Sequence, residues 1–595
     1  MTLAHTDPSR HDRSDRGAPA LVLGPILRFV DESRATVWVE TDRATGVRID
    51  TSVGVTAQTD TWGVGGHHYA IVVVEGLPPD AQVDYTVTLG DDAGPDAVWP
   101  PDGEPCRLRT AAVGADVTIA FGSCRRGDTY DEESLGRIGA DALVGLAHRV
   151  NTEAPQRRPD LLMLLGDQVY ADDPSPEILT RLHRHRAQTG GHGGTVGRGE
   201  LNDEVAEEIC DFEEYTWLYA ESWGTPEVRA LMAAVPSCMI LDDHDLRDDW
   251  NSSMDWRRTV TVAPWWPRRV VGAFTSYWIY QHLGNLSPES LAADPVYAAV
   301  RGAATDAERE QILADFALRA DAEPDSARWS FVRDLGDTRL IVIDSRCSRD
   351  LDPERRTMLD DTEWRWLRTV ATETDARHIV FGTSLPYLML PALHHLEQWN
   401  EAVAQGAWGP RAAKLGEKLR LELDLEHWAA FDNSFDAMAD LVGDLTSRAD
   451  PPASVVWLSG DVHCSYVAEA ELVGRATPDT TLCQLTMSPF RNPLERPVRA
   501  VNRIAVKAPM VKLMRALAKR AGAGPSAMSW KATAGPWFDN GVMSLTVSGE
   551  RLSVRVEHAF VDGDGAQRLS QTHVADLTAG GRVSAAQRGQ QPLGQ

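Results

Sequence analysis

The sequence predicts a small all-β domain followed by a larger layered α/β domain. Residues 21–112 hold short runs of apolar and β-branched residues separated by Gly, Pro and Asp, a pattern typical of an antiparallel sandwich. After Ala112, apolar strand-like runs alternate with long helical stretches over residues 113–490. We expect the first domain to be immunoglobulin-like or fibronectin-like and the second to carry the chemistry.

The charge of the chain excludes some classes of function. Its 595 residues include 59 Lys+Arg and 87 Asp+Glu, a formal net charge of −28. Duplex binding needs a cationic surface, so this charge argues against a general nucleic-acid binder. It also argues against loose adhesion of the whole chain to anionic membranes. An anionic substrate stays compatible, because a bound metal can invert the local field.

Several kinds of segment are absent from the sequence. The seven cysteines are scattered and never spaced C-x-x-C, which disfavours a disulfide framework, a zinc ribbon and a thioredoxin-type motif. No apolar run approaches the ~18 residues that a membrane helix needs. Residues 1–20 contain neither an apolar signal region nor an intact twin-arginine motif. We therefore expect a cytoplasmic protein with a disordered tail over residues 1–20, an exported form being the alternative.

Six apolar runs in the α/β region lead directly into polar residues. These runs reach Cys124, Asp167, Asp243, Asp344, Ser384 and Asp461. In α/β sheets, ligands bind at the carboxyl ends of the strands. Any one of these acids alone would be read as a helix cap. Six strand ends with this mix of side chains favour one shared site.

The side chains at these strand ends are of metal-binding types. Asp167, Asp243 and Asp461, with Asp248 as an alternative to Asp243, supply hard oxygen atoms that suit Ca²⁺, Mg²⁺ or Mn²⁺. Cys124, Tyr170 and His463 supply softer or anionic ligands, and thiolate with phenolate suits Fe³⁺. The run LDDHD at 241–245 concentrates like charge, which is costly without a cation. The alternatives are a buried hydrophobic Cys124, an ordinary buried Tyr170 and a solvated acidic turn.

Three further residues are candidates for the substrate side of this site: His244, Arg125 and Arg346. An Arg fork binds a pair of phosphate oxygens, and a His can protonate a leaving oxygen. Two metals ~3.5–4 Å apart would clamp a phosphoryl group and generate a hydroxide for in-line attack. We therefore expect metal-dependent hydrolysis of a small-molecule or lipid phosphate ester. The alternatives are a non-catalytic metal-binding module on a phosphatase scaffold and a membrane-recruited phospholipid phosphodiesterase.

Five motifs follow one another in the order and spacing of a known family. They are FGSC at 121–124, LLGDQVYADD at 164–173, LDDHDLRDDW at 241–250, DSRCSR at 344–349 and SGDVH at 459–463. Over residues 21–490 the chain resembles the PhoD-like (alkaline phosphatase D) family of the calcineurin-like metallophosphoesterase superfamily. The resemblance implies a four-layer αββα fold with a metal centre at one edge. It also implies phosphodiesterase or alkaline phosphomonoesterase activity with Fe³⁺ and Ca²⁺, or another divalent metal in place of Ca²⁺.

The resemblance also implies roles for particular residues. Iron would be held by Cys124, Asp167, Tyr170 and His463, and Asp167 would bridge to a second metal shared with Asp243 and Asp461. Arg346 lies where the family carries its D-x-R motif. The family commonly has Asn-Asn where this chain has Asp248 and Asp249, which leaves the choice between Asp243 and Asp248 open. Known members are often exported by the twin-arginine route, a signal that this chain does not show, so the resemblance bears on chemistry and not on location.

The C-terminal part of the chain has its own pattern. Residues 491–520 hold nine Lys or Arg and one Glu, a local charge of +8. The spacing predicts two short amphipathic helices within 491–525, interrupted at Pro509. We expect them to dock on the acidic surface of the protein itself, the alternative being contact with a membrane, a polyanion or an anionic substrate. Residues 526–562 are predicted to add strands to the catalytic sheet, and 563–595 to form a flexible tail.

Overall fold

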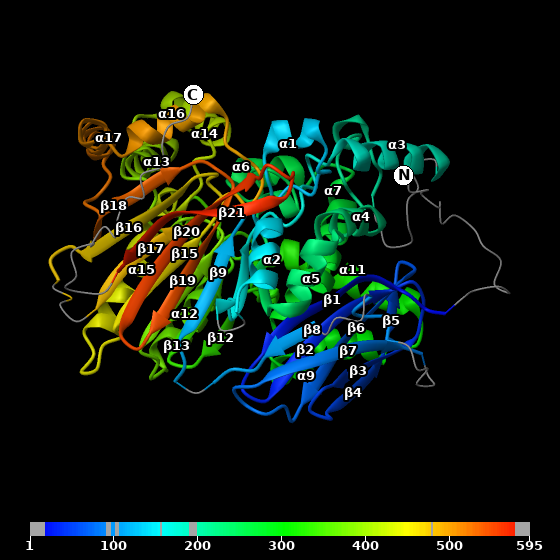
Figure 1. The fold of residues 1–595 in the computed structure, drawn as a ribbon. Coiled ribbons are helices and arrows are strands. Elements are labelled where there is room, and N and C mark those ends of the chain that lie inside the picture. Colours follow the sequence, from blue (N-terminus) through cyan, green and yellow to red (C-terminus); the bar gives the residue numbers. More distant parts are fainter. Residues whose placement is uncertain are drawn as a thin grey trace.

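The computed structural model describes residues 18–577, apart from 91–96, 102–105, 113, 155–156, 190–198, 476 and 478–479. The predicted tail at residues 1–20 therefore lies almost wholly outside the described residues. None of the helices in this described part combines the length and the apolar character that a membrane span requires. Figure 1 shows an N-terminal β region, coloured blue, beside a larger body of helices and sheets.

The N-terminal region consists of two four-stranded antiparallel sheets. The first has the order β1 (Leu21–Val30), β2 (Arg34–Thr41), β6 (His67–Glu75) and β5 (Trp62–Val64). The second has the order β4 (Thr56–Asp60), β3 (Gly46–Thr51), β7 (Gln82–Leu89) and β8 (Cys106–Arg109). Val37 and Val72 of the first sheet share one core with Val47 and Val87 of the second. The predicted all-β domain is confirmed, and its immunoglobulin-like character stays a prediction.

Two larger sheets form the second region. One has the order β11 (Ser237–Ile240), β10 (Leu161–Leu165), β9 (Val117–Gly122), β19 (Gly541–Ser548), β20 (Arg551–Val561) and β21 (Gln567–Asp576). The other has the order β12 (Phe331–Leu335), β13 (Thr338–Ile343), β14 (His378–Thr383), β15 (Ser454–Ser459), β17 (Thr481–Thr486), β16 (Ser465–Leu472) and β18 (Met528–Trp537). Strands β9 to β11 pair in parallel, as do β13, β14, β15 and β17.

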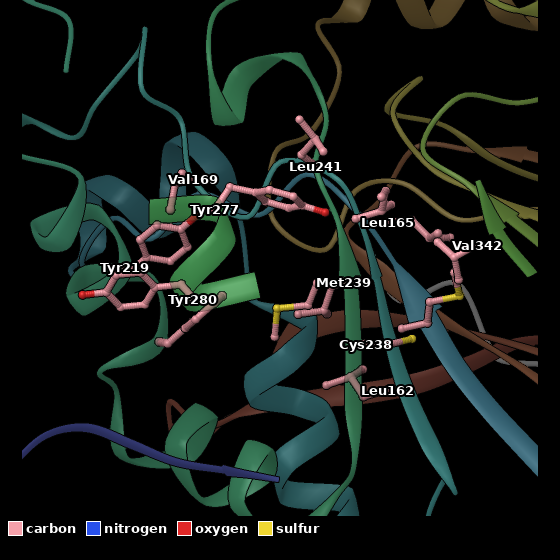
Figure 2. Packing of buried hydrophobic residues seen from close by; sticks show 14 of the residues in the cluster. Leu162, Leu165, Val169, Tyr219, Cys238, Met239, Leu241, Tyr277, Tyr280 and Val342 are labelled. Carbon is pink, nitrogen blue, oxygen red and sulfur yellow. The ribbon is translucent and has the colours of Figure 1, made fainter. Parts of the chain in front are cut away.

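The central parallel strands are buried along their whole length. All five residues of β10 are buried, as are all six of β14 and of β15. Figure 2 shows Leu165 of β10 near Val342 of β13, and both belong to one apolar cluster. Helix α2 (Ala142–Thr152) packs on β21, and α12 (Asp361–Thr372) packs on β13. This is the mixed α/β domain that the sequence predicts, whereas its four-layer order stays a prediction.

The C-terminal strands complete both large sheets. Strand β18 pairs with β16, while β19 pairs with β9. The prediction of a flexible tail from residue 563 is wrong over residues 567–576, which form β21 at the edge of the sheet and pair with β20. Gln567 and Ala575 are the only residues of β21 classed as buried, so the polar composition of an edge strand resembles that of a tail. The rest of the predicted tail, 578–595, lies outside the described residues.

The basic segment forms two helices, as predicted. They are α16 (Arg496–Ala505) and α17 (Ala508–Ala521), with Pro509 in the first turn of α17. Their buried side chains are small or neutral: Asn502, Ala505, Ala518 and Ala521. Within the described residues no ion pair joins either helix to an acid. The structure therefore provides no ionic docking of these helices among the described residues, because they pack through Val506, Met510, Val511 and Met514 against an apolar cluster that includes Leu390 and Phe538.

A charged histidine joins the N-terminal sandwich to the α/β domain. His67 of β6 places Nδ1 2.7 Å from Glu40 Oε1 and Nε2 2.9 Å from Oε2 of Glu213, which lies on α4 (Phe212–Trp223). Burial alone would lower the pKa of His67. The two carboxylates outweigh burial and raise its pKa to about 9. The imidazolium is therefore part of the contact between the two regions at neutral pH.

We expect His67→Gln to destabilise the protein in a pH-dependent way. A group whose folded pKa is raised contributes stability that is complete below the unfolded pKa, about 6.5, and is lost as the pH rises through about 9. Urea unfolding should show a difference of about 3 kcal/mol between wild type and variant at pH 6. This difference should shrink towards zero at pH 10. His68→Gln is the control, and a difference that stays constant across this pH range would contradict the interpretation.

Candidate metal centre

The ends of three parallel strands meet at one point of the α/β domain. Cys124 follows β9, Asp167 follows β10, and Asp461 and His463 follow β15. The Cys124 backbone N–H donates to the carbonyl oxygen of Gly166 at 3.2 Å, and the Asp461 N–H donates to Ser123 Oγ at 2.9 Å. The first bond joins two neighbouring strand ends of the six-stranded sheet, and the second joins that sheet to the seven-stranded one. At this point three of the six predicted strand ends, from both sheets, lie together.

Four of the predicted ligands have an unusual backbone conformation. Cys124, Asp167, Asp461 and His463 have φ values of 55°, 50°, 63° and 46°. The left-handed region costs a non-glycine residue roughly 1–2 kcal/mol, and such strain tends to persist at functional sites. Gly166, beside Asp167, has φ 101°, and a Cβ there would lie 2.5 Å from Asp242 Cβ. The turn after β10 therefore requires glycine so that Asp167 can approach Asp242.

The structure brings the six predicted metal ligands together around Asp167. Three groups have potential ligand atoms that lie within 4.8 Å of one another: Cys124, Asp167 and His463; Asp167, Asp243 and His244; Asp167, Asp242, Asp243 and Asp461. Asp167 is the member common to all three. Tyr170 Oη lies 3.5 Å from Asp167 Oδ2. Asp167 thus belongs both to a group that offers sulfur and nitrogen, with the Tyr170 phenol nearby, and to an oxygen-rich group.

The electrostatics of this cluster fit bound cations. Asp167 Oδ1 and Asp242 Oδ2 are buried without a hydrogen-bond partner. Burial raises the pKa of the Asp167 carboxyl well above its usual range, and Asp242 and Asp461 raise it further. Burial likewise raises the pKa of the Cys124 thiol, helped by Asp167 and Asp461. Buried acids at such close range need a counter-charge, which metal ions would supply.

His463 is prepared to act as a neutral ligand. Burial lowers its pKa to about 4, since a charged imidazolium would be poorly solvated there. A neutral imidazole keeps a lone pair for a metal. Its backbone N–H donates to Ser488 Oγ at 3.2 Å, and Ser488 Oγ donates to Cys124 Sγ at 3.2 Å. One serine therefore connects two of the predicted iron ligands.

The sequence leaves a choice between Asp243 and Asp248 as ligand, and these two acids lie in different surroundings. Asp243 is buried and belongs to the ligand groups around Asp167. The Asp248 side chain is 62% exposed and lies 3.9 Å from His244 Nε2. The Asp248 backbone N–H is held by Asp172 Oδ2 at 2.7 Å. Of these two acids, only Asp243 lies in the candidate ligand groups around Asp167.

His244 is held as a cation beside this group. Its Nδ1 lies 2.9 Å from Asp172 Oδ1, and its ring centroid lies 4.7 Å from that of Tyr170. Burial would lower the pKa of His244, but Asp172, Asp167 and Asp243 raise it well above its usual value. The side chain remains 23% exposed. An oriented, accessible imidazolium matches the substrate-side position predicted for it.

The two predicted substrate-binding arginines have other partners. Arg346 is fully buried, and its guanidinium contacts Asp242, Glu426 and Asp243. Nε and Nη1 donate to Asp242 and Glu426, whereas Nη2 lies 3.2 Å from Asp243 Oδ1 without a hydrogen bond. The buried position of Arg346 does not support the predicted contact with phosphate, and its ion pairs favour a positioning role beside the acids of the cluster.

Arg125 also lacks a free fork for phosphate. Its Nε and Nη2 donate to Asp141 Oδ2 at 3.0 and 2.7 Å, and Nη1 donates to Ser222 Oγ at 3.0 Å. Its side chain is 1% exposed. The predicted substrate role is therefore not supported by its position, since the buried Arg125–Asp141 pair already uses these donors.

Three residues near the centre were missed in the sequence. Asp242 adjoins Asp243, and only the register of the turn after β11 shows that both face Asp167. His427 Nε2 lies 3.4 Å from Asp461 Oδ2, while its Nδ1 lies 2.6 Å from Glu397 Oε1. Asn492 Nδ2 donates to Tyr170 Oη at 2.9 Å. His427 and Asn492 belong to segments without a recognisable motif, so no sequence signal indicates them.

Comparisons with known proteins agree with this arrangement. A domain of unknown function (DUF7800) matches residues 18–111, and a family described as PhoD-like phosphatase matches residues 145–493. A solved structure titled "Structure of PhoD" covers 96% of this chain and 94% of its own, with 14% identity and a TM-score of 0.57. At this identity the likeness shows the fold alone. A pullulan hydrolase from Thermococcus kodakarensis, with 12% identity over 94% of this chain and all of its own, has a TM-score of 0.10 and carries no argument. The curated proteins contain no significant match.

The PhoD-like match covers more than half of the chain. It includes every predicted metal ligand except Cys124, which lies upstream of residue 145. The matched family is a phosphatase family, and the candidate ligand groups lie where its resemblance places a metal centre. The chain belongs to the PhoD-like phosphatase family.

Proposed function

We propose that this protein hydrolyses phosphodiesters and, at alkaline pH, phosphomonoesters at a centre that binds Fe³⁺ and Ca²⁺. Family membership implies metal-dependent phosphoester hydrolysis in general. One observation supports the finer proposal: Asp167 is shared by a group with Cys124 and His463 and by an all-carboxylate group with Asp243 and Asp461. Such a carboxylate suits two cations of different character.

The residues divide into metal-holding and substrate-binding sets. Cys124, Tyr170 and His463 would hold iron, and Asp243 and Asp461 would hold the second metal, with Asp167 between them. When bound, the two cations would polarise the phosphoryl group and lower the pKa of the attacking water.

His244 is the proposed substrate-binding and acid residue. Its imidazolium would bind a phosphate oxygen or give the Nε2 proton to the leaving oxygen. Asp172 fixes the Nδ1 side of the ring and so orients Nε2. These steps require only a charged, accessible ring beside the metal ligands, which matches the position of His244.

The test of this function combines metal content, colour and turnover. We expect the purified protein to contain iron and calcium and to absorb visible light through charge transfer from Cys124 and Tyr170 to Fe³⁺. It should hydrolyse a chromogenic phosphodiester, with the rate rising towards alkaline pH. Colourless, metal-free protein with full activity would overturn the metal assignment. Metal-bound protein inactive on both diesters and monoesters would favour the non-catalytic module instead.

The Tyr170→Phe variant tests the contribution of the phenol independently of the other proposed iron ligands. We expect it to shift or remove most of the visible band and to lower kcat at least tenfold, since a ligand and its contact with Asn492 are lost. Tyr130→Phe is the control, because Tyr130 is a partly buried tyrosine whose hydroxyl contacts Asp141 instead. An unchanged spectrum in Tyr170→Phe would remove Tyr170 from the ligand set.

A further inference from the structure

Helices α16 and α17 carry exposed aliphatic side chains. Val498, Val501, Ile504 and Leu513 are between 43% and 58% exposed. Fourteen large hydrophobic residues are exposed in the described part of the chain, and these four fall within sixteen consecutive positions. Scattered exposed aliphatics need no explanation, but a local concentration marks a contact surface. We call α16 and α17 together the basic hairpin.

The basic hairpin also carries positive charges that form no ion pairs with acids of the described chain. Residues 496–521 contain eight Lys or Arg and no acid. In the portion of the chain that the structure describes, none of these eight forms an ion pair with a carboxylate. Arg499 donates to the Leu494 carbonyl, Arg515 to His395, and Arg503 stacks over Phe538. On a chain of net charge −28, the positive charge of this segment is therefore not neutralised by a carboxylate among the described residues.

Apolar and basic residues occupy different faces of α16. Val498, Val501 and Ile504 recur at three-residue spacing, which keeps them on one side of a helix. Arg496, Arg499 and Arg503 recur at spacings of three and four on another side. In α17, exposed Leu513 adjoins exposed Lys512. Figure 1 shows both helices at the outer end of the molecule together with α13 (Pro391–Ala404) and α14 (Pro410–Glu422).

We propose that the basic hairpin is a docking surface for a membrane that contains anionic lipids. Aliphatic side chains favour the boundary with the acyl chains, while lysine and arginine favour anionic headgroups. A nucleic acid would use the cations but give no favourable contact to Val501, Ile504 and Leu513. The acidic remainder of the protein would be repelled by the same membrane, which confines contact to this surface. This proposal does not depend on the reaction that the metal centre performs.

The basic hairpin is connected to two features that a lipid ligand would reach. Asn492, which contacts Tyr170, lies four residues before α16. Beside α17 lies a cavity of about 450 Å³, whose lining includes Arg515, Lys519 and Trp530. Cations and an aromatic ring in one cavity suit a lipid headgroup with its glycerol. Docking through the basic hairpin would thus bring the surface of a bilayer next to the segment that supports the metal centre.

Cosedimentation of the full chain with vesicles tests the proposal. We expect the protein to bind vesicles of phosphatidylglycerol and phosphatidylcholine at least tenfold more strongly than vesicles of phosphatidylcholine alone, because each cation near an anionic surface contributes about fivefold. High salt should weaken the binding. Absence of binding to the anionic vesicles, or equal binding to both kinds, would overturn the proposal.

Two sets of variants separate lipid from other polyanions. The apolar set is V501S/I504S/L513S, and the charge set is R503Q/K512Q/K519Q. Each set should lower vesicle binding at least tenfold, with circular dichroism and hydrolysis of a soluble phosphodiester unchanged. The matched controls, which are exposed elsewhere, are V22S/V53S/V262S and R258Q/R355Q/R368Q.

The pattern of vesicle binding across these variants shows whether a bilayer contacts the basic hairpin. Loss of binding in both hairpin sets, with both controls intact, supports a bilayer. Loss in the charge set alone would overturn a lipid surface in favour of a soluble polyanion. Unchanged binding in both hairpin sets would place the contact elsewhere and also overturn the proposal. Failure of the soluble phosphodiester assay in wild-type protein would contradict the proposed function without affecting this outcome.

Discussion

Asp167→Asn should lower kcat for phosphoester hydrolysis by about a thousandfold or more, equivalent to roughly 4 kcal/mol of transition-state stabilisation. Asp167 is fully buried, and it is the residue common to the three candidate ligand groups. An amide has the same shape but no charge, so it would hold two cations poorly. We expect the iron and calcium content to fall together, because one carboxylate serves both sides of the centre.

The control for this prediction lies at the other end of the same strand. Asp160 precedes β10 and pairs with Arg109, and its carboxylate also accepts from the Thr118 backbone N–H. Asp160→Asn should alter stability while leaving metal content and kcat close to wild type. Activity would be measured with a chromogenic phosphodiester, and metal content by elemental analysis. Full activity in Asp167→Asn, or loss of one metal alone, would remove Asp167 from the bridging role.

Thermal unfolding distinguishes a variant that is inactive because it has lost its metals from one that is inactive because it has misfolded. Asp167→Asn removes one of several buried acids that repel each other, so the metal-free variant should unfold at a temperature no lower than that of the metal-free wild type. Added Ca²⁺ should then stabilise the wild type more than the variant, because only tightly bound ligand shifts the unfolding equilibrium. An inactive variant that unfolds much earlier than metal-free wild type would mean that its inactivity reflects misfolding.

The sequence predicted the parts of the centre that follow directly from parallel strands. Cys124, Asp167 and Asp461 each come two positions after the end of a strand, and parallel strands place such positions at a common edge. The contacts between the two sheets follow from glycines that allow the strand ends to approach. Gly460 is an example, since a Cβ there would lie 2.3 Å from Ser123 Oγ. Local pattern therefore determines where the ligands meet.

What the sequence could not predict depends on partners that lie far along the chain. His427 reaches Asp461 from a helical insertion, and its position depends on Glu397 in another helix. Arg125 and Arg346 were identified as cations near the site, but their partners Asp141 and Glu426 decide what they do. A residue type indicates which contacts are chemically available. Only the packing of the insertions determines which of them is made.

Arg346→Met should lower the free energy of unfolding of the metal-free protein by about 3–5 kcal/mol, the usual cost of leaving buried charges without their partner. Arg346 is fully buried and contacts Asp242, Asp243 and Glu426. Methionine fills much of the volume but provides no charge. The three carboxylates would then repel each other in a site that water barely reaches.

The control and the alternative role can be measured in the same experiment. Arg368→Met removes a surface pair with Asp444, and exposed pairs contribute about 0–1 kcal/mol. If Arg346 instead bound the substrate phosphate, its replacement would raise KM and leave the stability near that of wild type. Urea unfolding together with KM and kcat therefore distinguishes positioning from substrate contact. A stable variant with raised KM would restore the role predicted from the D-x-R motif.

Metal binding should reduce the effect of Arg346→Met on stability. The substitution leaves Asp242, Asp243 and Glu426 without their cation, and Asp242 and Asp243 also belong to the ligand groups around Asp167. Metal ions held there would neutralise part of the charge that Arg346 neutralises in the metal-free protein. The destabilisation by Arg346→Met should therefore be smaller with Fe³⁺ and Ca²⁺ bound than without them. An equal effect in both states would mean that Arg346 and the metals act on separate acids, so that Glu426 would be its main partner.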